Sequence, residues 1–324
     1  MQFAGIDVAK RLFDIALPLG NGKYRTRAKI GNDAAGHAQL LTWLKDHAPD
    51  AAVGMEATGV YHEALAQVLV DGGVRVFVFN PAQIAAFAKS ELARTKTDRH
   101  DAKLIARFCL AQQATGRELR PWAPTPPAQR RLRALVHRLD DLKAMRQMER
   151  NRRDVADEAV HVSIDRVIKH FDKQIAATER AIGRHIDDND DLRGQQDLLN
   201  SIPGIADTTS AWLLACLGDT RQFTDVRQLV AFAGLNPRVR ESGTWKGCTR
   251  ISKTGDPSLR AHLYMPAVAA KQHNPIIRAF CQRLSDRGRK PIVTVVAAMR
   301  KLLHIAWGVL RSGRPFDPNH GLAA

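Results

Sequence analysis

Four acidic residues stand where segments of regular structure are expected to begin or end. Asp7 and Glu56 each end a short apolar strand, and Asp98 and Asp101 lie three residues apart at the start of a helix. Strand ends of an α/β sheet project to one edge, and helix residues three apart are neighbours on the helix surface. Carboxylate oxygens suit Mg²⁺ or Mn²⁺, and a pair of such ions stabilises both oxygens of a phosphodiester displacement. The acids therefore predict a metal-dependent site for phosphodiester chemistry.

Each acid also has an ordinary structural interpretation. Asp98 can cap its helix, with Asp101 as the partner three residues on. Asp7 can form a turn after its strand, and Glu56 can be a surface side chain. For any single acid this alternative is about as good as the metal site, whereas four acids at such positions in a basic chain favour the site.

A serine lies where a nucleophile acting on DNA would need to be. Ser242 precedes Gly243 in a loop rich in cations, which would neutralise a phosphate and the charge that develops in its transition state. From the residues alone, a loop serine before glycine is usually part of a turn, and Ser201, Ser252 and Ser258 compete with it. The cations of this loop, expected to contact nucleic acid, are Arg238, Arg240, Lys246, Arg250 and Lys253.

The charge of the chain indicates a polyanionic partner. The 324 residues include 49 Lys and Arg against 33 Asp and Glu, a formal net charge of +16. From residue 201 to the end the chain has 18 basic and 7 acidic residues. A solvated basic surface is the alternative, but such surfaces usually mix both signs. Nucleic acid is therefore the predicted partner.

Several classes of protein are disfavoured. The sequence has neither a GxxxxGK[ST] nor a GxGxxG motif, so ATP and dinucleotide binding are unsupported. The four cysteines are far apart, which argues against a zinc ribbon or a disulfide framework and fits a reducing cytosol. No stretch approaches the ~20 apolar residues of a membrane span. We expect a cytoplasmic, nucleoid-associated protein with no membrane partner.

Hydrophobic periodicity predicts an α/β domain over residues 1–114. A β-hairpin is expected to turn at Gly20-Asn21-Gly22, next to a first strand at 3–8. Further strands are expected at 51–56 and 74–79, with helices at 33–47, 60–70 and 98–114. Such an alternation describes a mixed sheet with helices packed on it.

The middle of the chain is expected to be a coiled coil. Residues 115–127 are rich in proline and predict a linker. In the segment 128–192, apolar residues recur in heptads over 132–142 and 164–182. The two helices can fold back as a hairpin around 154–163, or pair with another subunit. A long helix inside an ordinary core is the remaining alternative.

The last segment, 193–324, is expected to be mainly α-helical. A Pro-Gly turn at Gly204, before a helix at 208–217, has the form of a helix-hairpin-helix whose N–H groups contact phosphate. Ala206 stands where the usual second glycine would be, so an ordinary turn between helices is the alternative. Three closing helices are expected at 257–272, 275–286 and 291–311.

The whole chain resembles the DEDD transposases, which are insertion-sequence recombinases related to the Piv/MooV DNA invertases. Some of these enzymes are guided by a bridge RNA that the element encodes. The motifs that carry the resemblance are Gly5-Ile6-Asp7, Glu56-Ala57-Thr58-Gly59, Lys96-Thr97-Asp98-Arg99-His100-Asp101-Ala102, Ile202-Pro203-Gly204-Ile205, Phe232-Ala233-Gly234-Leu235-Asn236-Pro237, Glu241-Ser242-Gly243 and Leu263-Tyr264-Met265-Pro266-Ala267.

The resemblance implies specific roles for these residues. It implies a RuvC-like, RNase H fold whose acids Asp7, Glu56, Asp98 and Asp101 hold Mg²⁺ or Mn²⁺. It also implies a C-terminal domain in which Ser242 forms a covalent phosphoserine link to DNA. In such proteins the coiled coil pairs subunits, so a homodimer, or a tetramer on DNA, is expected. The departure from the pattern is Ala206.

The favoured hypothesis is a site-specific recombinase that inserts, excises or inverts donor and target DNA, with target choice supplied largely by a structured noncoding guide RNA bound to its basic surfaces. A hydrolytic, RuvC-like nuclease of Holliday junctions, with a structural Ser242, is the second hypothesis. A basic nucleic-acid-binding scaffold without catalysis is the third. Covalent trapping of DNA separates the first two, and tight binding without cleavage under Mg²⁺ would favour the third.

Overall fold

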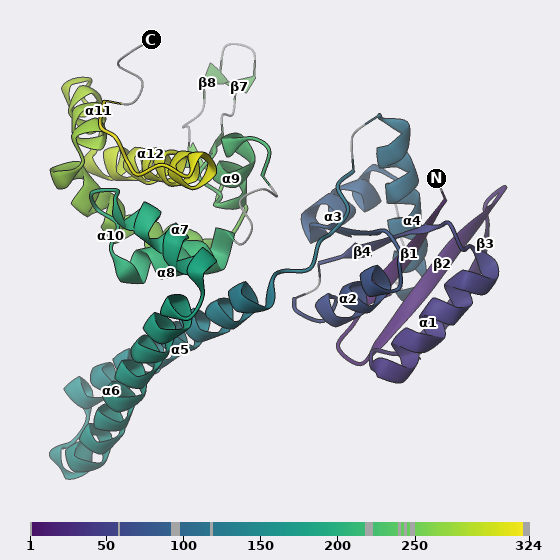
Figure 1. The fold of residues 1–324 in the computed structure, drawn as a ribbon, viewed down its shortest axis with the longest axis horizontal. Coiled ribbons are helices and arrows are strands. Elements are labelled where there is room, and N and C mark those ends of the chain that lie inside the picture. Colours follow the sequence, from purple (N-terminus) through teal and green to yellow (C-terminus); the bar gives the residue numbers. More distant parts are fainter. Residues whose placement is uncertain are drawn as a thin grey trace. The chain divides into compact units, whose positions relative to one another are not determined.

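The computed structural model describes residues 2–57, 59–91, 98–116, 119–217, 223–238, 241–242, 245–246 and 250–319. The chain divides into two compact units, Met1–Pro124 and Thr125–Ala324, and the boundary falls inside the proline-rich segment 115–127. The buried hydrophobic residues form two clusters in the first unit and one in the second. Figure 1 shows the elements of both units, which are described separately below.

The first unit contains a five-stranded mixed sheet. Its strands are β1 (Phe3–Val8), β2 (Leu12–Gly20), β3 (Lys23–Gly31), β4 (Ala52–Glu56) and β5 (Val76–Phe79). Their order in the sheet is β3-β2-β1-β4-β5. The hairpin strands run antiparallel to one another, and β2 runs antiparallel to β1, whereas β1, β4 and β5 are parallel. The predicted α/β class with a mixed sheet is confirmed.

Helices cover both faces of this sheet (Figure 1). On one face, α1 (Ala34–His47) and α2 (Glu63–Asp71) bury their apolar residues against β1, β2 and β4. On the other face lie α3 (Pro81–Ser90) and α4 (Asp98–Ala114), which form a second core with the remaining strand residues. Helix α3 begins at the predicted Asn80-Pro81 strand end, where Asn80 caps it, but this helix was not predicted from the sequence.

The second unit begins with two long helices, α5 (Pro127–Val155) and α6 (Glu158–Asp187). They pack antiparallel as a hairpin that turns at residues 156–157 (Figure 1). Leu132, Leu139, Leu142 and Ile182 are buried members of one core, as their heptad spacing predicts. The two helices fold back on each other within this chain, and the same core includes residues of the later helices; pairing with another subunit stays a prediction.

The remaining helices complete the core of the second unit. They are α7 (Asp190–Asn200), α8 (Asp207–Leu217), α9 (Val226–Phe232), α10 (Pro257–His273), α11 (Pro275–Asp286) and α12 (Pro291–Ser312). The last three match the predicted ranges to within one residue, whereas α7 and α9 were not predicted. Among the described helices, α12 alone has the length and composition of a membrane span, but Ala298, Leu302 and Ala306 are fully buried, as in a core helix.

Candidate active site

Two of the predicted acids lie at the ends of neighbouring parallel strands, Asp7 as the penultimate residue of β1 and Glu56 as the last residue of β4. In the register of β1 and β4, Gly5 pairs with Gly54 and Ile6 with Met55, so the next residue of each strand is Asp7 and Glu56. Both acids are partly exposed. Because side chains alternate between the faces of a strand, Asp7 lies on the same face as Gly5, and Glu56 on the same face as Gly54.

The paired glycines allow α4 to lie directly on that face. A Cβ at Gly5 would stand 2.2 Å from the carbonyl oxygen of Ala102 and 2.4 Å from the backbone nitrogen of Ala106. A Cβ at Gly54 would stand 2.2 Å from the Sγ atom of Cys109. Any side chain at either position would therefore lift α4 off the strands. The backbone contact brings the helix that carries Asp98 and Asp101 onto the face of Asp7 and Glu56.

The other two acids lie on the first turn of α4. Asp101 is partly buried and immediately precedes Ala102, the residue in contact with Gly5. Asp98 is the first residue of the helix, and its side chain lies outside the described part of the chain. Among the side chains that are described, no three acidic, histidine or cysteine residues form a group that could hold a metal ion. The donors themselves are carboxylates, which suit a hard divalent cation.

A fifth acid, Asp14, was not singled out from the sequence. It pairs directly with Asp7 across β1 and β2, so the two share a face, and only 7% of its surface is exposed. Its Oδ1 atom accepts a hydrogen bond of 2.7 Å from the backbone N–H of Lys29. Lys29 has a positive φ of 56° at an irregularity in the β2–β3 pairing. Asp7, Asp14 and Lys29 line one cavity of about 400 Å³.

Asn32 joins the two loops that follow the strand-end acids. Its Nδ2 atom donates to the carbonyl oxygen of Ala9, after β1, at 3.0 Å and to that of Tyr61, after β4, at 3.1 Å. Its Oδ1 atom lies 2.8 Å from Nε2 of His37. Because the amide nitrogen donates to two carbonyls, Oδ1 accepts, and His37 must be protonated at Nε2. Burial lowers the pKa of His37 and so favours its neutral form.

The loop after Glu56 contains a buried histidine, His62, which precedes α2. Burial lowers its pKa, and among the described residues its Nδ1 atom has no hydrogen-bond partner. On α4, burial raises the pKa of Cys109 to about 12, so that thiol is not a nucleophile at neutral pH. Cys109, Cys216 and Cys281 are free thiols, and Cys248 lies outside the described residues.

Ser242 lies on a β-ribbon of the second unit. Strands β6 (Pro237–Arg238) and β9 (Arg250–Ile251) pair antiparallel, and between them β7 (Glu241–Ser242) pairs with β8 (Trp245–Lys246). Ser242 is exposed and stands opposite Trp245. The hydroxyl of the competing Ser201 instead donates to Leu198 O and accepts from the N–H of Phe316. This bonding gives Ser201 a structural role.

Two of the predicted basic contacts lie in the short β6–β9 pair. Arg238 and Arg250 form a cross-strand pair, and both are exposed. Like charges directly opposite each other repel, and a bound anion would relieve that repulsion. Lys253 is exposed and has a φ of 55°, which a lysine rarely adopts. Arg240 lies outside the described residues, as does the side chain of Lys246.

A compact junction holds the ends of the ribbon. The N–H of Ser252 donates to Asn236 O, and that of Asp256 donates to Phe232 O, both at 2.8 Å. Nη1 of Arg260 donates to the carbonyl oxygen of Ala233, at the end of α9, at 3.1 Å. These bonds fix the chain where it enters and leaves the ribbon.

Gly204 has a φ of 104°, as a tight turn requires. A Cβ there would stand 2.7 to 2.9 Å from atoms of Ala270, so close packing of the turn against α10 already explains the glycine. Phosphate binding at this turn stays a prediction.

Comparisons with known proteins found two matching family models, several similar proteins and a similar solved structure. One family model, described as a transposase, matches residues 4–156, and another, described as transposase of the IS116/IS110/IS902 family, matches residues 196–282. The pilin gene-inverting protein of Moraxella bovis is 32% identical, over 97% of this chain and 97% of its own length. The mini-circle putative transposase for IS117 of Streptomyces coelicolor is 24% identical, over 99% of this chain and 96% of its own length. A solved structure of T. thermophilus RuvC with a Holliday junction substrate is 20% identical in sequence and has a TM-score of 0.29. The match spans 38% of this chain and 100% of the RuvC chain.

Proposed function

The chain belongs to the IS110 family of DEDD transposases and is an enzyme of DNA transposition or recombination, and from this premise we propose that it cuts and rejoins DNA through a covalent link to Ser242. Divalent metal ions, Mg²⁺ or Mn²⁺, assist the reaction. The proposed metal ligands are Asp7, Glu56, Asp98 and Asp101.

The observation that carries the metal-dependent part is the glycine contact between α4 and the sheet. Gly5 and Gly54 lie two residues before Asp7 and Glu56, on the same face, and each would collide with α4 if it had a side chain. Two strand positions thus serve to bring the start of α4 close to the two strand-end acids. Asp14, which is buried opposite Asp7, places a further carboxyl group in the same cavity.

The exposure and surroundings of Ser242 support its role as the nucleophile. The β6–β9 pair, which flanks β7 and β8 in the sequence, contains Arg238 and Arg250, whose like charges oppose each other across the strands. A phosphodiester placed near them would be neutralised, and the same cations would stabilise the charge of its transition state. The hydroxyl of Ser201 is instead engaged with the backbone, because it donates to Leu198 O and accepts from the N–H of Phe316.

In the proposed reaction, Oγ of Ser242 attacks the phosphorus of a DNA phosphodiester. The bond from phosphorus to the leaving sugar oxygen breaks as the phosphoserine ester forms; the serine loses a proton and the leaving oxygen gains one. The hydroxyl of another DNA end then attacks the ester and releases Ser242, so that rejoining needs no ATP. Bound metal ions would supply charge neutralisation at the reacting phosphate.

We propose further that a structured noncoding guide RNA selects the donor and target DNA. When base pairing chooses the sequence, the protein needs to recognise only backbone and shape, which its net charge of +16 suits. The proposed location is the cytoplasm, in association with the nucleoid.

The proposed oligomer is a homodimer, or a tetramer on DNA, formed through the α5–α6 hairpin. Near the turn of the hairpin, Met148, Val155 and Val162 are exposed, Val155 to 87%. Apolar side chains gathered at one end of a hairpin favour contact with another protein surface, and a second copy offers the same surface.

The test is a covalent trap on a denaturing gel. Purified protein is incubated with Mg²⁺, the noncoding RNA of its own element and labelled donor and target DNA. We expect a protein-linked DNA band with the wild-type protein and none with Ser242→Ala or Asp98→Ala. Ser258→Ala is the matched control, because this serine also lies in the basic C-terminal part and should leave the band unchanged.

Two results would contradict the proposal. Free cleaved DNA from wild type and Ser242→Ala alike, without a linked band, would show a hydrolytic nuclease. Tight binding of DNA with no cleavage in Mg²⁺ or Mn²⁺ would show a scaffold. Omitting the RNA tests guidance separately, because an undiminished band without RNA would refute it while leaving the serine chemistry in place.

A further inference from the structure

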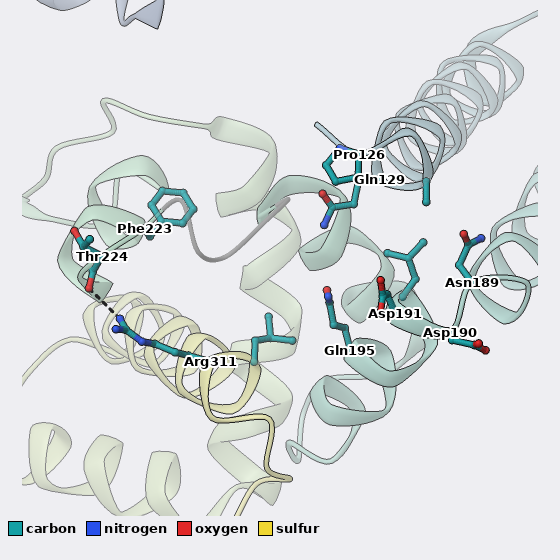
Figure 2. A pocket seen from close by; sticks show the side chains of 12 residues that line it. Pro126, Gln129, Asn189, Asp190, Asp191, Gln195, Phe223, Thr224 and Arg311 are labelled. Carbon is teal, nitrogen blue, oxygen red and sulfur yellow. Dashed lines mark hydrogen bonds between the residues drawn. The ribbon is translucent and has the colours of Figure 1, made fainter. Parts of the chain in front are cut away.

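The second unit contains a cavity of about 800 Å³ that lies among the starts of two helices and the end of a third (Figure 2). Gln129, on the first turn of α5, and Gln195, on α7, line it together with Asp190 and Asp191. On the opposite wall are Phe223, before α9, and Arg311, at the end of α12 (Figure 2). Cavities of this size accept small organic groups.

Gln129 is the unusual member of this lining. Only 7% of its surface is exposed, and its Oε1 atom has no hydrogen-bond partner among the described residues. A buried polar atom without a partner is costly, and the cost disappears when a ligand supplies the partner. If the amide oxygen and nitrogen of Gln129 exchange positions, the nitrogen is the buried atom that lacks a partner. Gln129 therefore points to a polar ligand in this cavity.

The walls offer a particular combination of groups. Two carboxamides provide both donors and acceptors, and the carboxylates of Asp190 and Asp191 provide further acceptors. Phe223 presents a flat apolar ring. Arg311 donates from Nη1 to the carbonyl oxygen of Thr224 at 3.0 Å, and its guanidinium lies over the ring of Trp307 at 4.8 Å. A planar guanidinium held in this way keeps further donors for a ligand.

We propose that this cavity binds one unstacked nucleobase of a single-stranded segment of nucleic acid, and that it prefers bases with an exocyclic amino group, which are adenine, cytosine and guanine, over thymine and uracil. Gln129 and Gln195 read the polar edge of the base, as carboxamides do with adenine. The carboxylates accept hydrogen bonds from the exocyclic amino group that these three bases carry and that thymine and uracil lack. Phe223 contacts the face of the base, and Arg311 lies near the strand's phosphate.

The charges of the cavity lining and of the chain disfavour two other ligands, free phosphate and a basic peptide. A free phosphate would meet the carboxylates of Asp190 and Asp191, which repel it. A basic peptide would satisfy these acids, but it would meet Arg311 and a protein whose net charge is +16. Uracil and thymine would turn carbonyl oxygens toward the acids. A neutral base with an amino group suits the whole lining, and its strand is attracted by the chain's charge.

The inference goes beyond the proposed recombination, and it rests on that function only for the presence of single-stranded nucleic acid. Its test is therefore a binding measurement without metal or cleavage. Fluorescein-labelled short strands of one base, oligo(dA), oligo(dC), oligo(dT), oligo(rA) and oligo(rU), are titrated with the full chain and followed by anisotropy. The comparison of ribo- with deoxyribo-strands shows whether the base comes from RNA or DNA.

The variants isolate the cavity from the general charge of the protein. Gln129→Met and Gln195→Met each remove a carboxamide and keep an unbranched side chain of similar length. Gln147→Met is the matched control, because Gln147 is exposed on the same helix, α5, and its amide donates to Asn151, one turn further on. None of these substitutions changes the charge, so the shared electrostatic attraction to the strands stays the same.

We expect wild type and Gln147→Met to bind the adenine and cytosine strands about fivefold more tightly than thymine or uracil strands. Gln129→Met should lose most of this preference while its affinity for oligo(dT) stays unchanged, and Gln195→Met should weaken it in the same direction. Equal binding of all strands by wild type would overturn the inference. So would a preference that survives both substitutions in proteins with normal unfolding midpoints, or tighter binding of an oligolysine peptide than of any strand. The covalent trap could still succeed in each of these cases, so the two proposals fail separately.

Discussion

Replacing Gly5 by alanine is expected to displace α4 from the sheet. The new Cβ would stand 2.2 Å from Ala102 O and 2.4 Å from Ala106 N, whereas ordinary contacts begin at 3.4 Å. The obstructing atoms belong to the helix backbone, which cannot rotate away as a side chain can. The helix must therefore move by roughly 1 Å, the difference between the ordinary and the imposed distance.

This displacement should affect both stability and catalysis. Overpacking of a well-packed core typically lowers the free energy of unfolding by about 1–3 kcal/mol. A misplacement of about 1 Å in a catalytic group can lower a rate about a hundredfold. Because Asp98 and Asp101 lie on the first turn of α4, we expect a fall of this size in DNA cleavage and a higher Mg²⁺ concentration for half-maximal rate.

The measurements are chemical unfolding of the full chain and single-turnover cleavage at a series of Mg²⁺ concentrations. Gly183→Ala is the matched control: an alanine Cβ at this glycine of α6 would meet nothing within 4 Å. Alanine in such a helical position should stabilise by about 0.5–1 kcal/mol. Wild-type cleavage by Gly5→Ala, at an unchanged Mg²⁺ dependence, would refute the placement of α4 as the support of the site.

Three other predictions address different parts of the structure. Asn32→Ala removes the donors that join the loops after β1 and β4, so the rate of single-turnover cleavage should fall at least about tenfold with little change in DNA affinity. Asn32→Asp, whose side chain cannot donate, should be as slow as Asn32→Ala. A wild-type rate in either variant would refute the role of this link. Arg250→Ala should weaken binding of nucleic acid and reduce the slope of log affinity against log salt by about 1; an unchanged slope would mean that this arginine contacts no phosphate. Burial lowers the pKa of His37 in the folded chain, so its neutral form contributes stability above the ordinary histidine pKa of 6.5. This stability is lost as the pH falls from 6.5 toward the folded pKa. His37→Gln should flatten this part of the pH dependence of the free energy of unfolding, and an identical curve would contradict the prediction.

The sequence predicted the elements whose patterns are strong. Strands ending at Asp7 and Glu56 were expected from short apolar runs, and α10, α11 and α12 each begin at a proline, which marks a helix start. Helix α7 was not predicted because its acidic start gives no apolar repeat that would indicate a helix. In the structure Asp190 and Asp191 are the first turn of the helix, where negative charge is favourable.

The supporting residues of the site could not be predicted from spacing. Asp14 reads as one polar residue within an apolar strand, and its position opposite Asp7 follows only from the β1–β2 register. Asn32 acts through carbonyl groups of Ala9 and Tyr61, which any residue types would supply. The need for glycine at position 5 could not be predicted either, because it depends on the contact between β1 and the backbone of α4.

The two separate hydrophobic cores determine how the chain should respond to heat or denaturant. The cores of the first unit, which include Phe3 and Ile6, share no residue with that of the second, which includes Trp212 and Leu302. Chains built in this way need not unfold in one cooperative transition, and a single melting temperature then describes neither part. A substitution at Gly5 would move one transition and leave the other in place, so calorimetry can report which half of the protein a variant, or a bound strand, has changed.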